Sequence, residues 1–182
     1  MERQVFGFKY QSDFCKKLSL KEDNEYTSKF DAYTKKLPIQ IKTYKNNGEL
    51  MMADPFRYIN NNSDFILVVT NRNEKGEIIS ERILLIENEK FKIFLNENKF
   101  SVRAEYCKFC LDVVTNKKED DELFHQLMEI EKVKRKNSIL NMQAKRDHKK
   151  QKRVQWSIPN RHINTFLSMF KELDKKDLET YN

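Results

Sequence analysis

Residues 30–43, FDAYTKKLPIQIKT, have the pattern of a short, charged β-hairpin. Residues 30–33 would form the first strand, a basic turn follows, and residues 38–42 would form the second strand. Side chains alternate between the two faces of a strand, so Ile39 and Ile41 point to one side and Gln40 and Lys42 to the other. We therefore expect the Asp31 carboxylate to lie across from Gln40 and Lys42 on one face of the hairpin.

The composition around this hairpin is that of a folded protein. The 182 residues include 13 Phe and 7 Tyr, and 38% are hydrophobic, which is enough for a core despite 35% charged residues. No apolar stretch approaches the ~20 residues of a membrane span, and the first residues lack the basic and apolar regions of a signal peptide. Three Cys, an odd count, suit a reducing compartment. We expect a single domain over residues 1–182, in the cytoplasm and without membrane association.

The segments that follow the hairpin indicate an α/β (α+β) fold with a mixed central sheet flanked by helices. Residues 64–70, DFILVVT, form an apolar run typical of a strand buried on both faces. Residues 77–86 would pair with this strand in antiparallel orientation. Helices are expected from Ser12, from Asp54-Pro55, over 105–114, over 119–134 and from Asn160.

Three further expectations concern packing. In the helix over 119–134, the side chains of Leu123, Leu127 and Ile130 would face the core because of their helical spacing. Trp156 would also pack in the core. Residues 174–182 would form a loose tail.

The hairpin face carries side chains that suit phosphodiester hydrolysis, which needs a divalent ion held by carboxylates and a charge that positions water. Asp31 is the natural first metal ligand, Gln40 offers a carbonyl oxygen, and Lys42 is the natural polarising group. Since one acid binds Mg²⁺ weakly, a second carboxylate is expected, preferably Asp54, with Glu49 and then Asp13 as alternatives. Asp54 has an equally good explanation as a helix cap before Pro55.

At these residues the chain resembles the PD-(D/E)XK nucleases. Asp31, followed nine residues later by Gln40-Ile41-Lys42, is similar to a variant motif in which Gln replaces the usual acid. Segments 26–31, 54–57, 64–69 and 145–154 are also similar to restriction-like endonucleases of this superfamily predicted in large DNA viruses and bacteria.

The resemblance implies a restriction-endonuclease-like fold and a type II restriction-like enzyme. Such an enzyme would hydrolyse double-stranded DNA with Mg²⁺, as a homodimer that cuts both strands, and in the host cytoplasm if the protein is viral. The resemblance also gives catalytic roles to Asp31, Gln40, Lys42 and Asp54. In certain restriction enzymes a carboxylate from the following helix replaces the missing acid, and Asp54 would do so here, binding the metal with Asp31 and Gln40.

A basic segment favours a nucleic-acid partner. Between residues 132 and 153 the chain has ten Lys or Arg and one acid, Asp147, whereas the remainder sums to −2 within a total charge of +7. We expect segment 132–158 to bind DNA. Contacts to phosphates are expected from Lys145, Arg146, His148, Lys149, Lys150, Lys152 and Arg153. Side chains able to read base edges are Gln143, Gln151, Gln155 and Arg161.

Two departures from the nuclease pattern keep other functions open. Phe30, not Pro, precedes Asp31, and Gln40 brings no charge. The missing charge favours an alternative, a non-catalytic nucleic-acid-binding protein with a degenerate nuclease site. A third option is a protein-binding module whose basic segment docks an acidic partner. A zinc site is disfavoured, because Cys107 and Cys110 form one pair where a structural site usually needs two.

Overall fold

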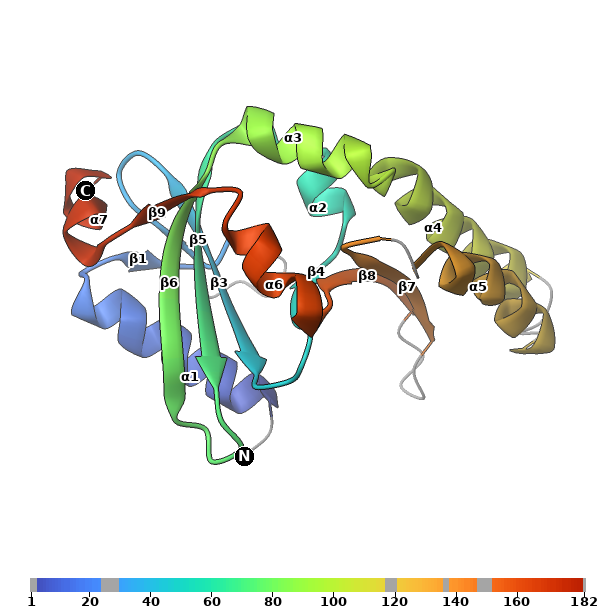
Figure 1. Ribbon diagram of the computed structural model, residues 1–182, viewed down its shortest axis with the longest axis horizontal. Coiled ribbons are helices and arrows are strands. Elements are labelled where there is room, and N and C mark those ends of the chain that lie inside the picture. Colours follow the sequence, from blue (N-terminus) through green and yellow to red (C-terminus); the bar gives the residue numbers. More distant parts are fainter. Residues whose placement is uncertain (1–2, 24–29, 117–120, 136–137, 147–151, 182) are drawn as a thin grey trace.

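The computed structural model describes residues 3–23, 30–116, 121–135, 138–146 and 152–181, excluding the side chains of 3–5, 115–116 and 133–135. Within these residues the chain forms a mixed six-stranded sheet and a smaller three-stranded sheet (Figure 1). The main sheet contains, in spatial order, β1 (Lys21–Glu22), β2 (Ala32–Tyr33), β3 (Pro38–Lys45), β5 (Phe65–Arg72), β6 (Ile78–Ile86) and β9 (Lys171–Leu173). The second sheet contains β4 (Leu50–Ala53), β8 (Lys152–Ile158) and β7 (Asn141–Arg146), in that order.

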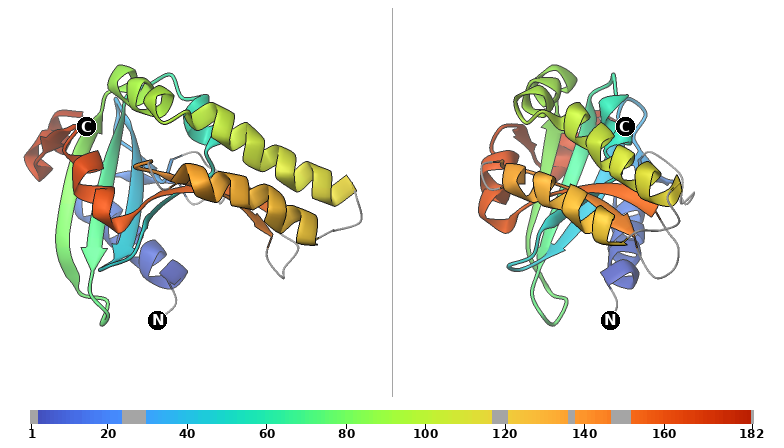
Figure 2. Two further views of the ribbon diagram at one scale, coloured as in Figure 1. Left: turned by 45° about the vertical axis from the view of Figure 1, so that its right-hand side comes forward. Right: turned by 90° about the vertical axis from the view of Figure 1, so that its right-hand side faces the viewer.

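Helices cover the main sheet and extend the second sheet into an arm. They are α1 (Arg3–Lys17), α2 (Phe56–Ile59), α3 (Asn88–Glu97), α4 (Phe100–Asn116), α5 (Asp121–Arg135), α6 (Asn160–Leu167) and α7 (Lys175–Tyr181). Helix α1 crosses one face of the main sheet, and α6 lies on the opposite side (Figure 1). Helices α4 and α5 run away from the main sheet alongside the second sheet (Figure 2). The mixed α/β class expected from the sequence is confirmed.

Strand β5 is at the centre of the main sheet because both of its faces are apolar. Ile66 and Val68 pack beneath α1, while Leu67 and Val69 pack in the larger core on the other side. The strand pairs in parallel with β3, where Ile39 lies opposite Ile66, and antiparallel with β6. The buried strand and its antiparallel partner expected at 64–70 and 77–86 are confirmed.

A buried ion pair joins α4, α5 and β7. Arg103 Nε donates to Glu131 Oε1 at 2.7 Å, and Arg103 Nη1 donates to the Leu140 carbonyl at 3.3 Å. Both charged side chains are buried in the large core. Breaking such a pair by removing one partner is strongly destabilising, since it leaves an uncompensated buried charge. The pair therefore fixes how the two arm helices lie on the second sheet.

Several boundaries and faces differ from the sequence expectations. Helix α1 begins at Arg3, not at Ser12. In α5 the inward side chains are Phe124, Met128 and Glu131, and Ile130 is 49% exposed. The inward face of α5 is shifted by one residue from the expected face, because Glu131 faces inward to pair with Arg103. Leu127 packs against the large core as expected, but the expected inward position of Ile130 was wrong.

The loose tail expected at residues 174–182 was also wrong. Residues 175–181 form α7, and the Leu178 side chain is buried beneath the main sheet with Tyr10 and Phe14 of α1. The Lys36 ammonium donates to the Thr180 carbonyl at 2.9 Å, which ties α7 to the hairpin turn. Among the described helices, none is long and apolar enough to cross a membrane.

Candidate functional site

The hairpin places Asp31 against the two polar side chains of β3. The Asp31 N–H donates to the Ile39 carbonyl at 2.9 Å, and Ala32 pairs with Ile39 in the antiparallel ladder. This register brings the Asp31 carboxylate to Gln40 and Lys42. Ile39 and Ile41 point into the core beneath α1, so the expected alternation of β3 side chains is confirmed.

One oxygen of Asp31 is the centre of the site. Asp31 Oδ2 accepts hydrogen bonds from the Ile41 N–H at 2.7 Å and from the Gln40 side-chain amide. The Lys42 ammonium lies 4.0 Å from the same oxygen. A charge-assisted bond from the backbone fixes the carboxylate, because the N–H of β3 cannot rotate away. The acid and the lysine are thus held at a defined separation.

The site is half-buried. Gln40 is buried, whereas the side chains of Asp31 and Lys42 are 26% and 17% exposed. Burial lowers the pKa of Lys42, and nearby Arg57 lowers it further, while Asp31 opposes both effects. Asp31, Lys42 and Gln11 of α1 line a cavity of about 210 Å³. A lysine with a lowered pKa in a cavity is a candidate for catalysis, although structural ion pairs also perturb pKa values.

Asp54 does not line the cavity that Asp31 and Lys42 share. Its Oδ1 accepts the Phe56 N–H at 2.9 Å, which is a capping bond at the start of α2. The Tyr58 hydroxyl of α2 donates to the Met52 carbonyl at 3.0 Å. Burial is the main reason that the pKa of Tyr58 is raised, with Asp31 and then Asp54 adding to the shift. The two carboxylates therefore both act on the pKa of Tyr58 but line different cavities.

The alternative second carboxylates have other partners or positions. Glu49 Oε1 accepts from Asn141 Nδ2 at 2.8 Å, and its Oε2 accepts from Ser157 Oγ at 2.6 Å. Both oxygens thus hold the second sheet together. Asp13 is exposed on α1 and lines a different cavity from Asp31. In the described part of the chain, no three His, Cys, Asp or Glu side chains come together as a metal site.

A second, larger cavity carries most of the positive charge near the site. It has a volume of about 720 Å³, and Asp54 and Asp112 are its acids. Its four cationic side chains come from α2, α4 and β8, and they are Arg57, Lys108, Lys152 and Arg153. Because Arg57 also acts on the pKa of Lys42, this basic cleft lies next to the Asp31–Lys42 site.

The remaining residues expected to contact DNA are divided among several places. Lys145 and Arg146 lie on β7, and Arg146 forms an ion pair with Asp121 at 2.5 Å. Gln143 lies opposite Gln155, which lines the basic cleft, whereas Arg161 is on α6 and donates to His162. His148, Lys149, Lys150 and Gln151 lie outside the described residues. Trp156 is buried edge-to-face against Phe100 at 4.9 Å, so the expected core position is confirmed.

Sequence reasoning missed two cations of the basic cleft. Lys108 lies between Cys107 and Cys110, and both of these thiols are buried. Burial raises the pKa of Cys107 to about 12, which keeps the thiol neutral. The helical spacing that turns both thiols inward also turns Lys108 outward, and this signal was present in the sequence. Arg57 follows the Asp54-Pro55 cap and could have been found from its place at the start of α2.

The chain matches no protein-family model, no curated protein and no solved structure.

Proposed function

We propose that the protein is a Mg²⁺-dependent endonuclease that hydrolyses phosphodiester bonds of double-stranded DNA, a type II restriction-like enzyme. The observation that carries this proposal is the placement of Asp31 and Lys42, with Lys42 Nζ 4.0 Å from Asp31 Oδ2 beside a cleft lined with cations. A carboxylate and an ammonium at this separation can bind a metal ion and stabilise charge on a phosphate at one place.

The side chains present suit a weakly held hard cation. Asp31 provides a carboxylate, and a half-turn of the Gln40 amide presents its carbonyl oxygen in place of its nitrogen. Mg²⁺ is typically bound through one or two carboxylates, with waters and substrate phosphates completing its shell. Asp54, which caps the start of α2, is the candidate for the second carboxylate. Mg²⁺ held by these residues would supply a Lewis acid, which would lower the pKa of a bound water and polarise a phosphoryl oxygen.

The protein's own residues have separate roles in this proposal. Asp31, fixed by the Ile41 N–H, orients the metal, and Lys42 stabilises negative charge that develops on the phosphate. Arg57, Lys108, Lys152 and Arg153 hold the DNA strand through its phosphates. In the same proposal the mixed sheet is a restriction-endonuclease-like core, and a homodimer positions two such sites on opposite strands.

A second candidate function has its own supporting observation. The Gln40 amide and the Ile41 N–H already satisfy the Asp31 oxygen that faces Lys42. A decayed site would keep this arrangement as a structural ion pair and retain the basic cleft. The alternative is therefore a non-catalytic protein that binds nucleic acid on the same surface.

Cleavage and binding assays separate these two functions. The purified chain is incubated with mixed-sequence duplex DNA and Mg²⁺, and the ends produced are sequenced. Cleavage is expected from the wild type and from Lys35→Met, an exposed lysine of the same hairpin, and is expected to be lost in Asp31→Asn and Lys42→Met. Equal cleavage by all four proteins would rule out the nuclease proposal. If the proteins bind DNA and none of the four cleaves it, the non-catalytic binding function is established.

A further inference from the structure

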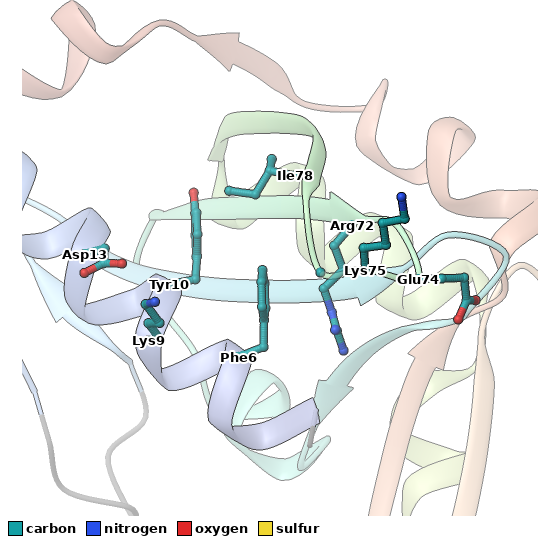
Figure 3. Close-up of a pocket in the computed structure, with 9 residues that line it drawn as sticks. Phe6, Lys9, Tyr10, Asp13, Arg72, Glu74, Lys75 and Ile78 are labelled. Atoms are coloured by element: carbon teal, nitrogen blue, oxygen red, sulfur yellow. The ribbon is translucent and has the colours of Figure 1, made fainter. Parts of the chain in front are cut away.

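A third cavity, of about 440 Å³, lies between α1 and the β5–β6 hairpin (Figure 3). The rings of Phe6 and Tyr10 extend into it from α1, and Arg72 reaches it from the end of β5. Neither Asp31 nor Asp54 lines this cavity, so it is separate from the site and the cleft described above.

Arg72 is an unusual residue for this position. Its side chain is 7% exposed, and no acceptor among the described residues reaches its buried Nε. The guanidinium carbon lies 4.6 Å from the centre of the Phe6 ring. A cation–π contact compensates only part of the cost of burying a charge, which normally requires an anionic partner. Arg72 therefore brings a buried cationic group to the cavity, and no described side chain accepts from its Nε.

A second polar group on the same strand face is also unpaired. Thr70 precedes Arg72 by two residues, so both side chains point toward α1. Thr70 is fully buried, and in the described structure its hydroxyl has no hydrogen-bond partner. Thr70 does not line the cavity, however, so Arg72 is the residue that favours a ligand there.

The charges around the cavity favour an anion. Lys9 and Lys75 are at its rim together with Asp13 and Glu74. Glu74 forms an ion pair with Lys45, which does not line the cavity, so its charge is compensated from outside. Among the lining side chains, Asp13 is then the one negative charge that offsets the three positive charges of Lys9, Arg72 and Lys75. The excess of positive charge suits a ligand with two negative charges.

The opposite wall is apolar and flat. The Tyr10 hydroxyl donates to Glu81, which fixes its ring, and the Ile78 side chain lies across from that ring (Figure 3). Gly76, with φ +87°, packs close to the Phe6 ring, where a Cβ atom would lie 3.7 Å from the ring carbons. Aromatic walls of this kind bind planar rings.

We propose that this cavity binds a phosphate monoester attached to a planar ring, the chemistry of a nucleoside monophosphate. The phosphate lies at Arg72, at the end of the cavity that also carries Lys75, and the ring lies against Tyr10 and Ile78 (Figure 3). Two sources share this chemistry, a free mononucleotide and the 5′-phosphorylated end of a DNA strand. The proposal does not depend on nuclease activity.

Isothermal titration of the full chain with adenosine 5′-monophosphate, without metal, tests the proposal. Saturable binding of the nucleotide is expected. Adenosine and inorganic phosphate should each bind at least tenfold more weakly, because adenosine lacks the phosphate contacts and inorganic phosphate lacks the ring contacts. Arg72→Met is expected to weaken binding at least tenfold, which corresponds to the loss of one strong charge-assisted contact. The matched control is Arg82→Met on the neighbouring strand, where Arg82 pairs with Glu172, and it is expected to bind like the wild type.

Thermal unfolding shows whether Arg72→Met has lost binding by losing its fold. Replacing an unpaired buried charge with an apolar side chain of similar size is expected to keep or raise the Tm. Lys75→Glu, at the exposed rim, provides a second variant that leaves the core intact and is also expected to weaken binding.

A comparison of oligonucleotides identifies the source of the phosphate. If a 5′-phosphorylated oligonucleotide binds more tightly than its unphosphorylated form, and Arg72→Met removes this difference, the DNA end is the source. Equal binding by Arg72→Met and Arg82→Met, or no saturation up to about 5 mM nucleotide, would overturn the proposal.

Discussion

Asp31 Oδ2 and the Lys42 ammonium lie 4.0 Å apart, and the backbone of β3 fixes this separation by donating the Ile41 N–H to the same oxygen at 2.7 Å. The main chain thus orients the Asp31 carboxylate, and strand β3 positions the Lys42 side chain. Substitutions around this pair report on metal binding, on proton binding and on DNA binding separately.

Changing Gln40 to Glu adds the charge that the site lacks. In EDTA at pH 8 we expect Gln40→Glu to lower the stability by about 1–3 kcal/mol, because the donor to Asp31 is lost and two carboxylates face each other. Mg²⁺ is expected to raise the Tm of this variant more than that of the wild type, since a paired carboxylate site binds the ion more tightly. Differential scanning fluorimetry with and without Mg²⁺ measures the effect. Gln126→Glu, on the exposed side of α5, is the control, and a Mg²⁺-insensitive Gln40→Glu would contradict metal binding at Asp31.

The lowered pKa of Lys42 gives a defined pH dependence of stability. Below its folded-state pKa the buried ammonium destabilises the fold. As the pH rises through that value toward about 10.4, the pKa of an unfolded lysine, the folded protein releases its proton first. The wild type should therefore gain stability relative to Lys42→Met as the pH rises toward about 10.4. Urea unfolding at several pH values measures the difference, and Lys35→Met should show no such trend.

The contribution of Lys108 to DNA binding can be measured through salt dependence. In an Asp31→Asn background, which prevents cleavage, Lys108→Ala should reduce the slope of log Kd against log salt by about 0.9, the value for one phosphate contact with duplex DNA. Fluorescence anisotropy with a labelled duplex provides the data. Lys176→Ala, an exposed lysine of α7, should leave the slope unchanged, and an unchanged slope in Lys108→Ala would remove the basic cleft from the DNA interface.

The C-terminal helix is expected to contribute to stability. Leu178 is buried with Tyr10 and Phe14, so Leu178→Ala should cost about 2–5 kcal/mol through lost transfer energy and a residual cavity. Chemical denaturation measures this cost. The neighbouring exposed change Glu179→Ala is the control and should stay within about 0.5 kcal/mol of the wild type.

Local patterns predicted the hairpin, the buried strand β5 and its partner β6. Period-two alternation and a run of apolar residues are decided by neighbouring positions, and Ile39, Ile41 and Val68 lie where that pattern puts them. The face of α5 could not be predicted in this way. Glu131 is inside because Arg103, 28 residues earlier in the chain, is inside as well, and no local pattern contains that pairing.

The sequence likewise predicted the hairpin part of the candidate site but not the part contributed by distant segments. Asp31, Gln40 and Lys42 lie within twelve residues on one hairpin, so strand geometry alone brings them together. The second sheet brings Lys152 and Arg153 next to Arg57 and Lys108, and this meeting depends on the pairing of β4 with β8. Tertiary pairing across about a hundred residues is not encoded in the spacing of any single segment.

Glu49 follows the turn that joins the main sheet to the arm, and its two carboxylate oxygens hold Asn141 of β7 and Ser157 of β8. The Glu49 side chain, which the sequence suggested as a possible metal ligand, therefore has a structural role. It ties the start of β4 to the other two strands of the second sheet, of which β8 carries Lys152 and Arg153. Removing this carboxylate would loosen the second sheet, and with it the strand that supplies two cations of the basic cleft.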